Sequence, residues 1–176
     1  MGTAFRQCDS RWPPLWEQTD QPSSRWHGSG QGPVQYFADT PHGAWAEFLR
    51  HEGIRDPQDF VGIARALWEY EIDSMPTAVP RLSDATLTGD QSTYPACQAE
   101  SARIRVTGEQ GLLAPSAALR PGMAAGVQVL DHAMSPGPPT DGQVVVLFGG
   151  RPDLVGWCCC IAGPPLDLLG RVQFMH

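Results

Sequence analysis

Residues 25–53, RWHGSGQGPVQYFADTPHGAWAEFLRHEG, decide the predicted fold and carry most of the chemical signal. The stretch opens on a polar, Gly-rich loop at residues 27–32, where the backbone can approach a ligand closely because glycine has no Cβ atom. Residues 33–38 follow as a run rich in β-branched and aromatic side chains, which predicts a short strand. The first half of the stretch therefore predicts a loop and a strand beside a ligand.

A helix is predicted directly after this strand. Asp39 and Thr40 offer side-chain oxygens to its first turn, and Pro41 stands where its missing N–H costs nothing. Gly53 is typical of the residue that ends a helix. An apolar stripe at helical spacing predicts the buried face, formed by Ala44, Trp45, Phe48 and Leu49. Glu47 lies within this apolar-rich run.

Working outward from this centre, the remaining patterns predict one α+β domain over residues 1–176, with a twisted mixed sheet and a few flanking helices. A helix is expected at 95–106 and a helical turn at 56–57, whereas residues 73–93 show little pattern. Trp12 and Trp16 are expected to anchor the loop at 11–24 on the body of the protein. Strands are expected at 3–8, 66–72, 111–114, 127–130, 144–148, 157–162 and 171–175, with 144–148 and 157–162 in the centre of the sheet because they are continuously apolar.

Composition narrows the class of protein. The 176 residues include 41% hydrophobic residues, which suits a soluble globular domain, and the net charge of −7 argues against binding to a phosphate backbone. No apolar run approaches the roughly 18–20 residues that span a bilayer, and no secretion signal precedes the first strand. Five cysteines, an odd number, favour reduced thiols and a cytoplasmic protein. We therefore expect neither a membrane association nor direct nucleic acid binding.

The run Cys158-Cys159-Cys160 invites a metal-site hypothesis. Adjacent residues of a strand point to opposite faces, so three consecutive cysteines cannot share one metal ion. The alternative is that they are small buried apolar residues of a central strand. We expect the latter, and no metal site is predicted anywhere in the chain.

Several short motifs, in order, resemble the RES-domain family of NAD-consuming bacterial toxins. The matches are Phe5-Arg6, Ser24-Arg25-Trp26-His27, Tyr36, Glu47 eleven residues later, and Pro115-Ser116-Ala117. They cover about residues 5–120, and the C-terminal strands at about 121–176 diverge. His27 departs from the family pattern, which has Asn at this place. The resemblance implies a fold similar to ADP-ribosyltransferases, with the sheet split in two around a cleft.

The resemblance also implies roles for individual residues. Glu47 would stabilise the ribosyl cation, Tyr36 would stack on nicotinamide, and Arg6 would hold the dinucleotide. The other residues implied in binding NAD, which is the substrate, are Arg25, Trp26, Gly28 and Ser116. An Arg suits phosphate because its planar fork pairs with two oxygens, and a carboxylate suits a developing cation.

The acceptor of the ribosyl group stays open at this point between water, phosphate and a protein side chain. Transferases that modify arginine resemble one another in a Glu or Gln two residues before the catalytic Glu, and Trp45 occupies that place, which favours a small acceptor. The implied function is a NAD glycohydrolase or phosphorylase acting as the toxin of a type II toxin–antitoxin pair. The alternatives are an ADP-ribosyltransferase, a NAD-using biosynthetic or defence enzyme, and a non-catalytic NAD-binding module. The implied partner is a helix-turn-helix (Xre-like) antitoxin, and a homodimer is left open.

Overall fold

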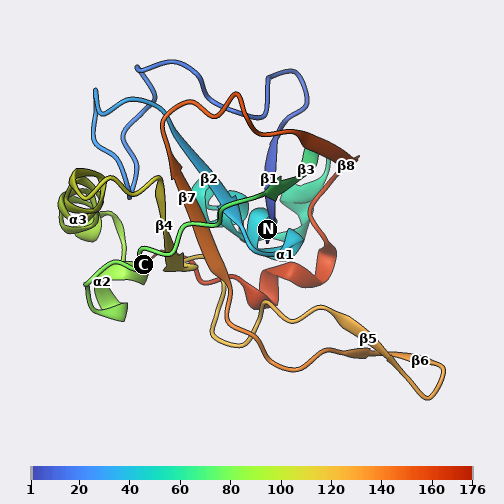
Figure 1. The fold of residues 1–176 in the computed structure, drawn as a ribbon. Coiled ribbons are helices and arrows are strands. Elements are labelled where there is room, and N and C mark those ends of the chain that lie inside the picture. The colour runs from blue at the N-terminus through green and yellow to red at the C-terminus, as the bar shows by residue number, and fades with distance from the viewer. Residues whose placement is uncertain (1, 176) are drawn as a thin grey trace.

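A six-stranded sheet organises residues 2–175, the part of the chain that the computed structural model describes (Figure 1). The strands lie in the order β4-β7-β2-β1-β3-β8, and every neighbouring pair is antiparallel. Their bounds are β1 Gly2–Asp9, β2 Val34–Ala38, β3 Arg65–Ile72, β4 Gly111–Pro115, β7 Gln143–Phe148 and β8 Gly156–Ala162. A separate hairpin consists of β5 (Val127–Leu130) and β6 (Ala133–Pro136).

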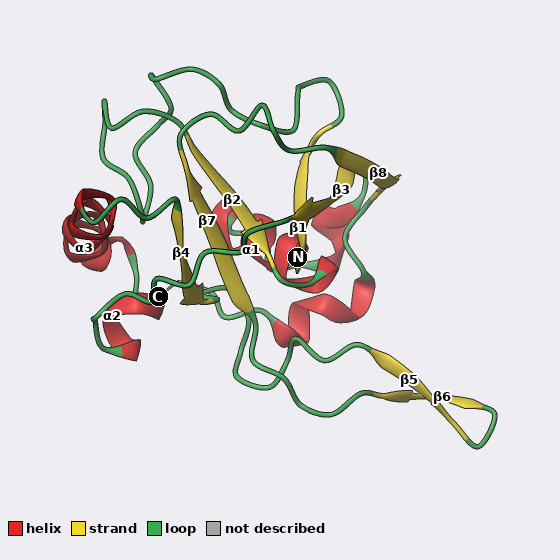
Figure 2. Ribbon diagram, in the orientation of Figure 1, coloured by secondary structure: helices red, strands yellow, loops and turns green. Residues whose placement is uncertain are grey.

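Within residues 2–175, three α-helices and three short 3₁₀ helices accompany the strands (Figure 2). The helices are α1 Pro41–Glu52, α2 Asp84–Thr88 and α3 Tyr94–Val106, and the 3₁₀ helices are η1 Pro57–Phe60, η2 Gln91–Thr93 and η3 Leu166–Arg171. Helix α1 contacts β1 and β2 in the middle of the sheet, whereas α2 and α3 contact the edge strand β4. The predicted α+β architecture is confirmed, but the expected mixed sheet is wrong, because every pair of neighbouring strands in this sheet is antiparallel.

The sheet is split between β1 and β2. Strand β1 pairs with β3 along its whole length, from Gly2 to Asp9, and β2 pairs with β7 along its whole length. Between β1 and β2, by contrast, only Phe5 and Ala38 stand in register. The two halves of the sheet therefore diverge on either side of this contact, which leaves room for side chains between them.

Helix α1 forms as its sequence predicts. The Thr40 hydroxyl accepts a hydrogen bond from the Gly43 N–H at 3.1 Å, and Pro41 occupies the first turn. Gly53 ends the helix with a positive φ of 67°, a conformation that glycine adopts at little cost. The predicted apolar stripe is buried, and Trp45, Phe48 and Leu49 belong to a core cluster that includes residues after β4 and near the C-terminus.

Helices α1 and α3 cover the same face of the sheet. Val34 of β2 packs with Cys97 and Ile104 of α3, and Ala38 of β2 packs with Ala44 of α1. Because alternate residues of a strand point to one face, both helices lie on the face that carries Tyr36. The space between the two helices on this face is where the candidate site lies.

Several expectations about individual segments are wrong. Residues 157–162 form an edge strand instead of a central one, and the thiols of Cys158, Cys159 and Cys160 are exposed instead of buried. Residues 171–175 contain no strand; Val172 makes only an isolated bridge with Leu119. Residues 73–93, in which no element was expected, hold α2, whose first turn is capped by the Ser83 side chain.

The wrong placement of residues 157–162 has a physical cause. A continuous apolar run does not distinguish a central strand from an exposed edge strand, because both have high strand propensity. Trp12 is 67% exposed, so it does not anchor the loop at 11–24. The backbone N–H of Trp16, by contrast, donates a hydrogen bond to Gln35 and holds the loop at that point.

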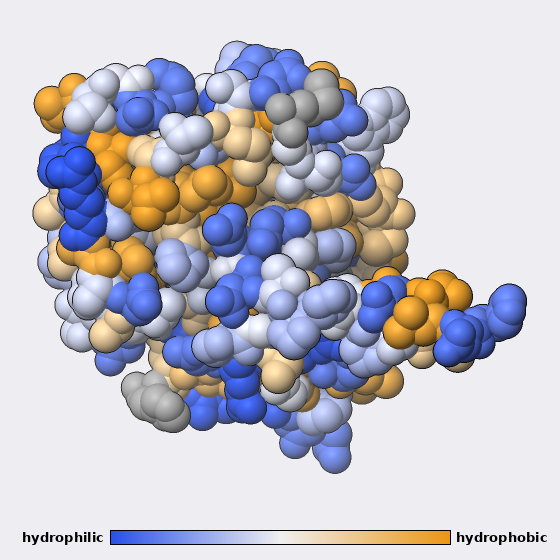
Figure 3. Space-filling model, turned by 60° about the horizontal axis from the view of Figure 1, so that its bottom comes forward, coloured by the Kyte–Doolittle hydropathy of each residue, from blue (hydrophilic) through white to orange (hydrophobic). Residues whose placement is uncertain are grey.

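The β5–β6 hairpin projects from the body and carries exposed apolar side chains, as Figure 3 shows. None of the helices within residues 2–175 is both long enough and apolar enough to cross a membrane.

Candidate active site

One cavity of about 560 Å³ gathers five of the seven residues that the sequence singled out. These five come from β1, from the loop before β2, from β2 itself and from α1, and they are Arg6, Arg25, Trp26, Tyr36 and Glu47. The cavity, which we call the cleft, lies at the split in the sheet and extends between α1 and the start of α3. Segments that are far apart in the sequence therefore meet at one site.

Glu47 projects from α1 into the cleft and is partly buried. The Ser116 hydroxyl donates a hydrogen bond to its Oε1 at 3.1 Å. Burial raises the pKa of the Glu47 carboxyl, and the Ser116 hydroxyl and the guanidinium groups of Arg50 and Arg25 oppose the rise only in part. A carboxylate in this setting is poorly hydrated, so its negative charge acts strongly on a neighbouring cation.

Arg25 is 8% exposed and is bound by polar atoms of the segment between α2 and α3. Its guanidinium donates to the Gly89 carbonyl at 2.7 Å and to the Thr93 hydroxyl at 3.2 Å. The same group lies over the Tyr94 ring, 4.8 Å from its centroid. No carboxylate oxygen among residues 2–175 lies within salt-bridge distance of Arg25.

Arg50 also lines the cleft, and the sequence prediction missed it. Arg50 is 6% exposed, and its guanidinium donates to the carbonyl oxygens of Gly89 at 2.9 Å, of Gln173 at 2.7 Å and of Ala117. Burial lowers the pKa of Arg50, although the nearby Glu47 opposes this. Two buried guanidinium groups thus converge on the Gly89 carbonyl, and Arg50, like Arg25, has no salt bridge within the described residues. A cleft wall of this kind suits an anionic ligand.

The ring of Tyr36 lines the cleft while its hydroxyl is fixed by the loop that precedes β2. This hydroxyl accepts the N–H of Trp26 at 3.1 Å and makes a second hydrogen bond with His27 Nδ1 at 3.0 Å. Burial raises the pKa of Tyr36 to about 12, so the hydroxyl stays protonated. His27, which stands where the family pattern has Asn, therefore orients the ring from behind the cleft.

Arg6 lies at the split in the sheet and is held by Gln35, a second residue that the prediction missed. The Arg6 guanidinium donates to Gln35 Oε1 at 2.9 Å, and the same oxygen accepts the Trp16 N–H at 3.0 Å. The Gln35 side-chain amide also donates to the Trp16 carbonyl. Burial lowers the pKa of Arg6. The buried Gln35 thus ties Arg6 and the loop at 11–24 to β2.

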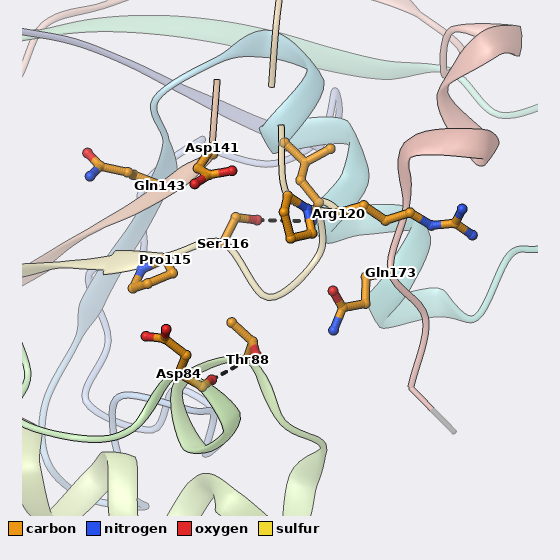
Figure 4. Close-up of a pocket in the computed structure, with 11 residues that line it drawn as sticks. Asp84, Thr88, Pro115, Ser116, Arg120, Asp141, Gln143 and Gln173 are labelled. Carbon is orange, nitrogen blue, oxygen red and sulfur yellow. Dashed lines mark hydrogen bonds between the residues drawn. The ribbon is translucent and has the colours of Figure 1, made fainter. Parts of the chain in front are cut away.

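The two remaining predicted residues, Ser116 and Gly28, do not line the cleft. Ser116 lines a second cavity of about 360 Å³, beside the segment that follows β4 (Figure 4). Its hydroxyl accepts the N–H groups of Ala118 and Leu119 besides donating to Glu47. The Gly28 N–H donates to Gln31 within its own loop. Ser116 is therefore placed to orient Glu47, and the Gly28 loop does not reach the cleft.

Signals for the two missed residues are present in the sequence but weak. Arg50 follows Glu47 by three residues and so stands on the same side of the helix, next to the apolar Leu49. Gln35 lies between Val34 and Tyr36 in a strand that is otherwise apolar. A polar residue within an apolar run is either a surface position or a buried one with dedicated partners, and only the structure distinguishes these cases.

The raised pKa of Glu47 predicts a cost in stability that can be measured. Because the folded state binds the proton more tightly than the unfolded state, the cost is absent below the ordinary pKa of 4.5 and develops as the pH rises through the folded value. Glu47→Gln should therefore raise the melting temperature at pH 7 by a few degrees, and the gain should vanish at pH values below 4.5. Scanning calorimetry of both proteins across this range checks the prediction, and a Glu47→Gln variant that melts below the wild type at pH 7 would refute it.

Comparison with known proteins defines the class to which this site belongs. A profile of the RES domain matches residues 3–136, which is more than half of the chain, so the protein belongs to the RES-domain family. The resemblance inferred from the motifs is thereby confirmed.

Among solved structures, a chain in the crystal structure of the M. tuberculosis MbcT–MbcA toxin–antitoxin complex is similar to this protein. The two share 16% sequence identity with a TM-score of 0.63, and the match covers 96% of this chain and 87% of that chain. At this level of identity the likeness establishes the fold alone. No curated protein matches the sequence.

Proposed function

We propose that this protein cleaves the bond between nicotinamide and ribose in NAD. The observation that carries the proposal is the content of the cleft: a partly buried carboxylate on α1, an aromatic ring on β2 and buried guanidinium groups that lack carboxylate partners among residues 2–175. NAD offers a matching set of groups, namely a flat cationic base, a ribose that becomes cationic and a pyrophosphate that is anionic.

The guanidinium groups would bind the pyrophosphate. Arg6 reaches the cleft from β1, and Arg25 and Arg50 from its other walls. The planar fork of an arginine pairs with two phosphate oxygens at once, and desolvation strengthens the attraction. Holding the pyrophosphate would fix the nicotinamide end of the molecule relative to Tyr36, so that its ring can stack on the base.

Glu47 would stabilise the reacting ribose. As the bond from C1′ to the pyridinium nitrogen breaks, its electron pair goes to that nitrogen, nicotinamide leaves as a neutral molecule, and positive charge develops on C1′ and the ring oxygen. A fixed, poorly hydrated carboxylate favours this charge more than it favours the ground state. Ser116 supports the step because its hydroxyl holds the carboxylate in place.

The acceptor that completes the reaction is proposed to be small. Trp45, two residues before Glu47, is buried in the core between α1 and the C-terminal segment, so no side chain at that position can orient a protein acceptor. Water would make the protein a NAD glycohydrolase, and phosphate a NAD phosphorylase. An ADP-ribosyltransferase, a NAD-using biosynthetic or defence enzyme and a non-catalytic NAD-binding module are the alternatives.

In the cell we propose that the protein acts as the toxin of a toxin–antitoxin pair in the cytoplasm. This proposal is supported by membership of the RES-domain family and by the fold shared with a chain of a toxin–antitoxin complex. A helix-turn-helix (Xre-like) antitoxin that covers the cleft is the proposed partner. Induced expression in bacteria should lower cellular NAD and arrest growth, and Glu47→Gln should do neither; arrest of equal strength by both proteins would contradict the proposed role.

Arg6→Ala tests the binding half of the proposal. Because Arg6 would contact the pyrophosphate and not the reacting carbon, its loss should weaken NAD binding by about tenfold or more, the scale of one charge-assisted hydrogen bond. Isothermal titration calorimetry measures the Kd for NAD of the Glu47→Gln and Arg6→Ala/Glu47→Gln proteins. Both carry Glu47→Gln so that NAD is not consumed during the titration. An unchanged Kd would remove Arg6 from the binding site.

A further inference from the structure

Strand β8 ends the six-stranded sheet and has a free outer edge (Figure 1). It pairs with β3 on its inner side, from Gly156 opposite Tyr70 to Ala162 opposite Arg65. Within residues 2–175, no backbone hydrogen bond joins the outer side of β8 to any other segment. An edge of this kind presents unpaired N–H and C=O groups that another strand can complete.

The composition of β8 offers little protection against such pairing. The sequence GWCCCIA contains no charged residue and no proline, which are the residues that commonly blunt an edge. Its apolar side chains face solvent: Trp157 is 67% exposed and Ile161 is 62% exposed. The one irregularity is a bulge at Cys159, which has no register partner in β3; it is the one feature of β8 of the kind that protects an edge.

The pattern of β8 is self-complementary about Cys159. If two copies of the strand run antiparallel with their Cys159 residues opposite each other, Trp157 of one copy faces Ile161 of the other, and Cys158 faces Cys160. The pairing brings no charges of β8 together, which matters for a chain with a net charge of −7. A two-fold axis through one surface patch is the usual geometry of a homodimer.

We propose that β8 is a dimerisation edge through which two copies of this chain form one continuous sheet, and that oxidation can lock the dimer. Opposite residues in an antiparallel pair have Cα atoms about 4.5–5.5 Å apart, within the range of about 4.4–6.8 Å that a disulfide spans. The oxidant is a low-molecular-weight disulfide such as oxidised glutathione. Two Cys159 thiols lose their protons and two electrons to form the S–S bond, and the glutathione disulfide is reduced to two thiols.

The dimerisation edge is independent of the proposed NAD chemistry. No residue of β8 lines the cleft, so pairing along this edge leaves the cleft open. Failure of either proposal therefore leaves the other intact.

The test compares the wild type with Ile161→Lys by sedimentation velocity over a range of concentrations, with and without reductant. The substitution puts a charge on an exposed position, so it should not disturb the fold, which circular dichroism checks. We expect a concentration-dependent wild-type dimer and a dimerisation Kd at least about tenfold higher for Ile161→Lys. A wild type that stays monomeric in both conditions, or a dimer that Ile161→Lys leaves unchanged, would overturn the proposal.

The cysteines give a second, separate readout. Treatment with oxidised glutathione should produce a covalent wild-type dimer on a non-reducing gel. The triple variant Cys158→Ser/Cys159→Ser/Cys160→Ser should lower its yield strongly, because the same register also sets Cys158 opposite Cys160. Cys8→Ser is the matched control, because Cys8 is a half-buried thiol on β1 and should not contribute. Cross-linking that is lost in Cys8→Ser, or that is equally efficient in Ile161→Lys, would mean chance collisions of thiols and would contradict an ordered edge.

Discussion

Glu47→Gln is expected to lower the turnover of NAD at least about a hundredfold, the scale for removing one preorganised electrostatic group. The amide keeps the size of the side chain and can still accept the hydrogen bond from Ser116, which lies 3.1 Å from Oε1. What it loses is the negative charge that, in the proposed reaction, stands beside the ribose. The expected loss is in the rate constant of cleavage, with NAD binding largely retained.

The control for this prediction is Glu71→Gln, which makes the same chemical change at an exposed position of β3 outside the cleft. Initial rates of nicotinamide release are measured for both variants and the wild type. They distinguish the loss of a carboxylate in the cleft from the loss of a carboxylate elsewhere on the protein. Wild-type turnover in Glu47→Gln would exclude Glu47 from the reaction, whatever else binds in the cleft.

Arg50→Leu is expected to lower the free energy of unfolding by about 3 kcal/mol, more than Glu47→Gln or Arg6→Ala. The guanidinium is buried and satisfies carbonyl oxygens on three separate segments, at Gly89, Ala117 and Gln173. Leucine fills part of the space but leaves buried acceptors unpaired, which costs about 1–3 kcal/mol for each one that water cannot reach. Removal of this cation should also weaken NAD binding.

Urea denaturation measures this loss, and Arg81→Leu is the matched control. Arg81 is exposed, and its side chain makes no hydrogen bond to any described residue, so its replacement should change the free energy of unfolding by less than about 0.5 kcal/mol. Equal stability of the two variants would mean that the Arg50 contacts contribute little to the fold.

Local sequence patterns predicted the parts of the structure that depend on local interactions. The Thr40 cap, Pro41 and Gly53 define α1 through contacts within a few residues, so a single chain is enough to place it. The helix expected at 95–106 likewise appears as α3, and Gly108, with a positive φ of 85°, follows its end. Five of the residues that line the cleft were found because the order of short motifs resembles a known family; they are Arg6, Arg25, Trp26, Tyr36 and Glu47.

Interactions between distant segments could not be predicted in the same way. Arg50 contacts carbonyl groups up to 123 residues away in the chain, and backbone carbonyls leave no trace in a sequence. The Ser116 motif was recognised, but its partner proved to be Glu47, 69 residues earlier. Strand β8 was placed in the centre of the sheet because its apolar run fits both places, and only the pairing order puts it at the edge.

The most direct test of the proposed function is incubation of the purified protein with NAD, with and without inorganic phosphate, followed by chromatography of free nicotinamide. We predict that nicotinamide is released by the wild type in at least one of the two buffers, and that Glu47→Gln releases at least about a hundredfold less. NAD that stays intact in both buffers, with water and phosphate each available as acceptor, would contradict cleavage in this cleft.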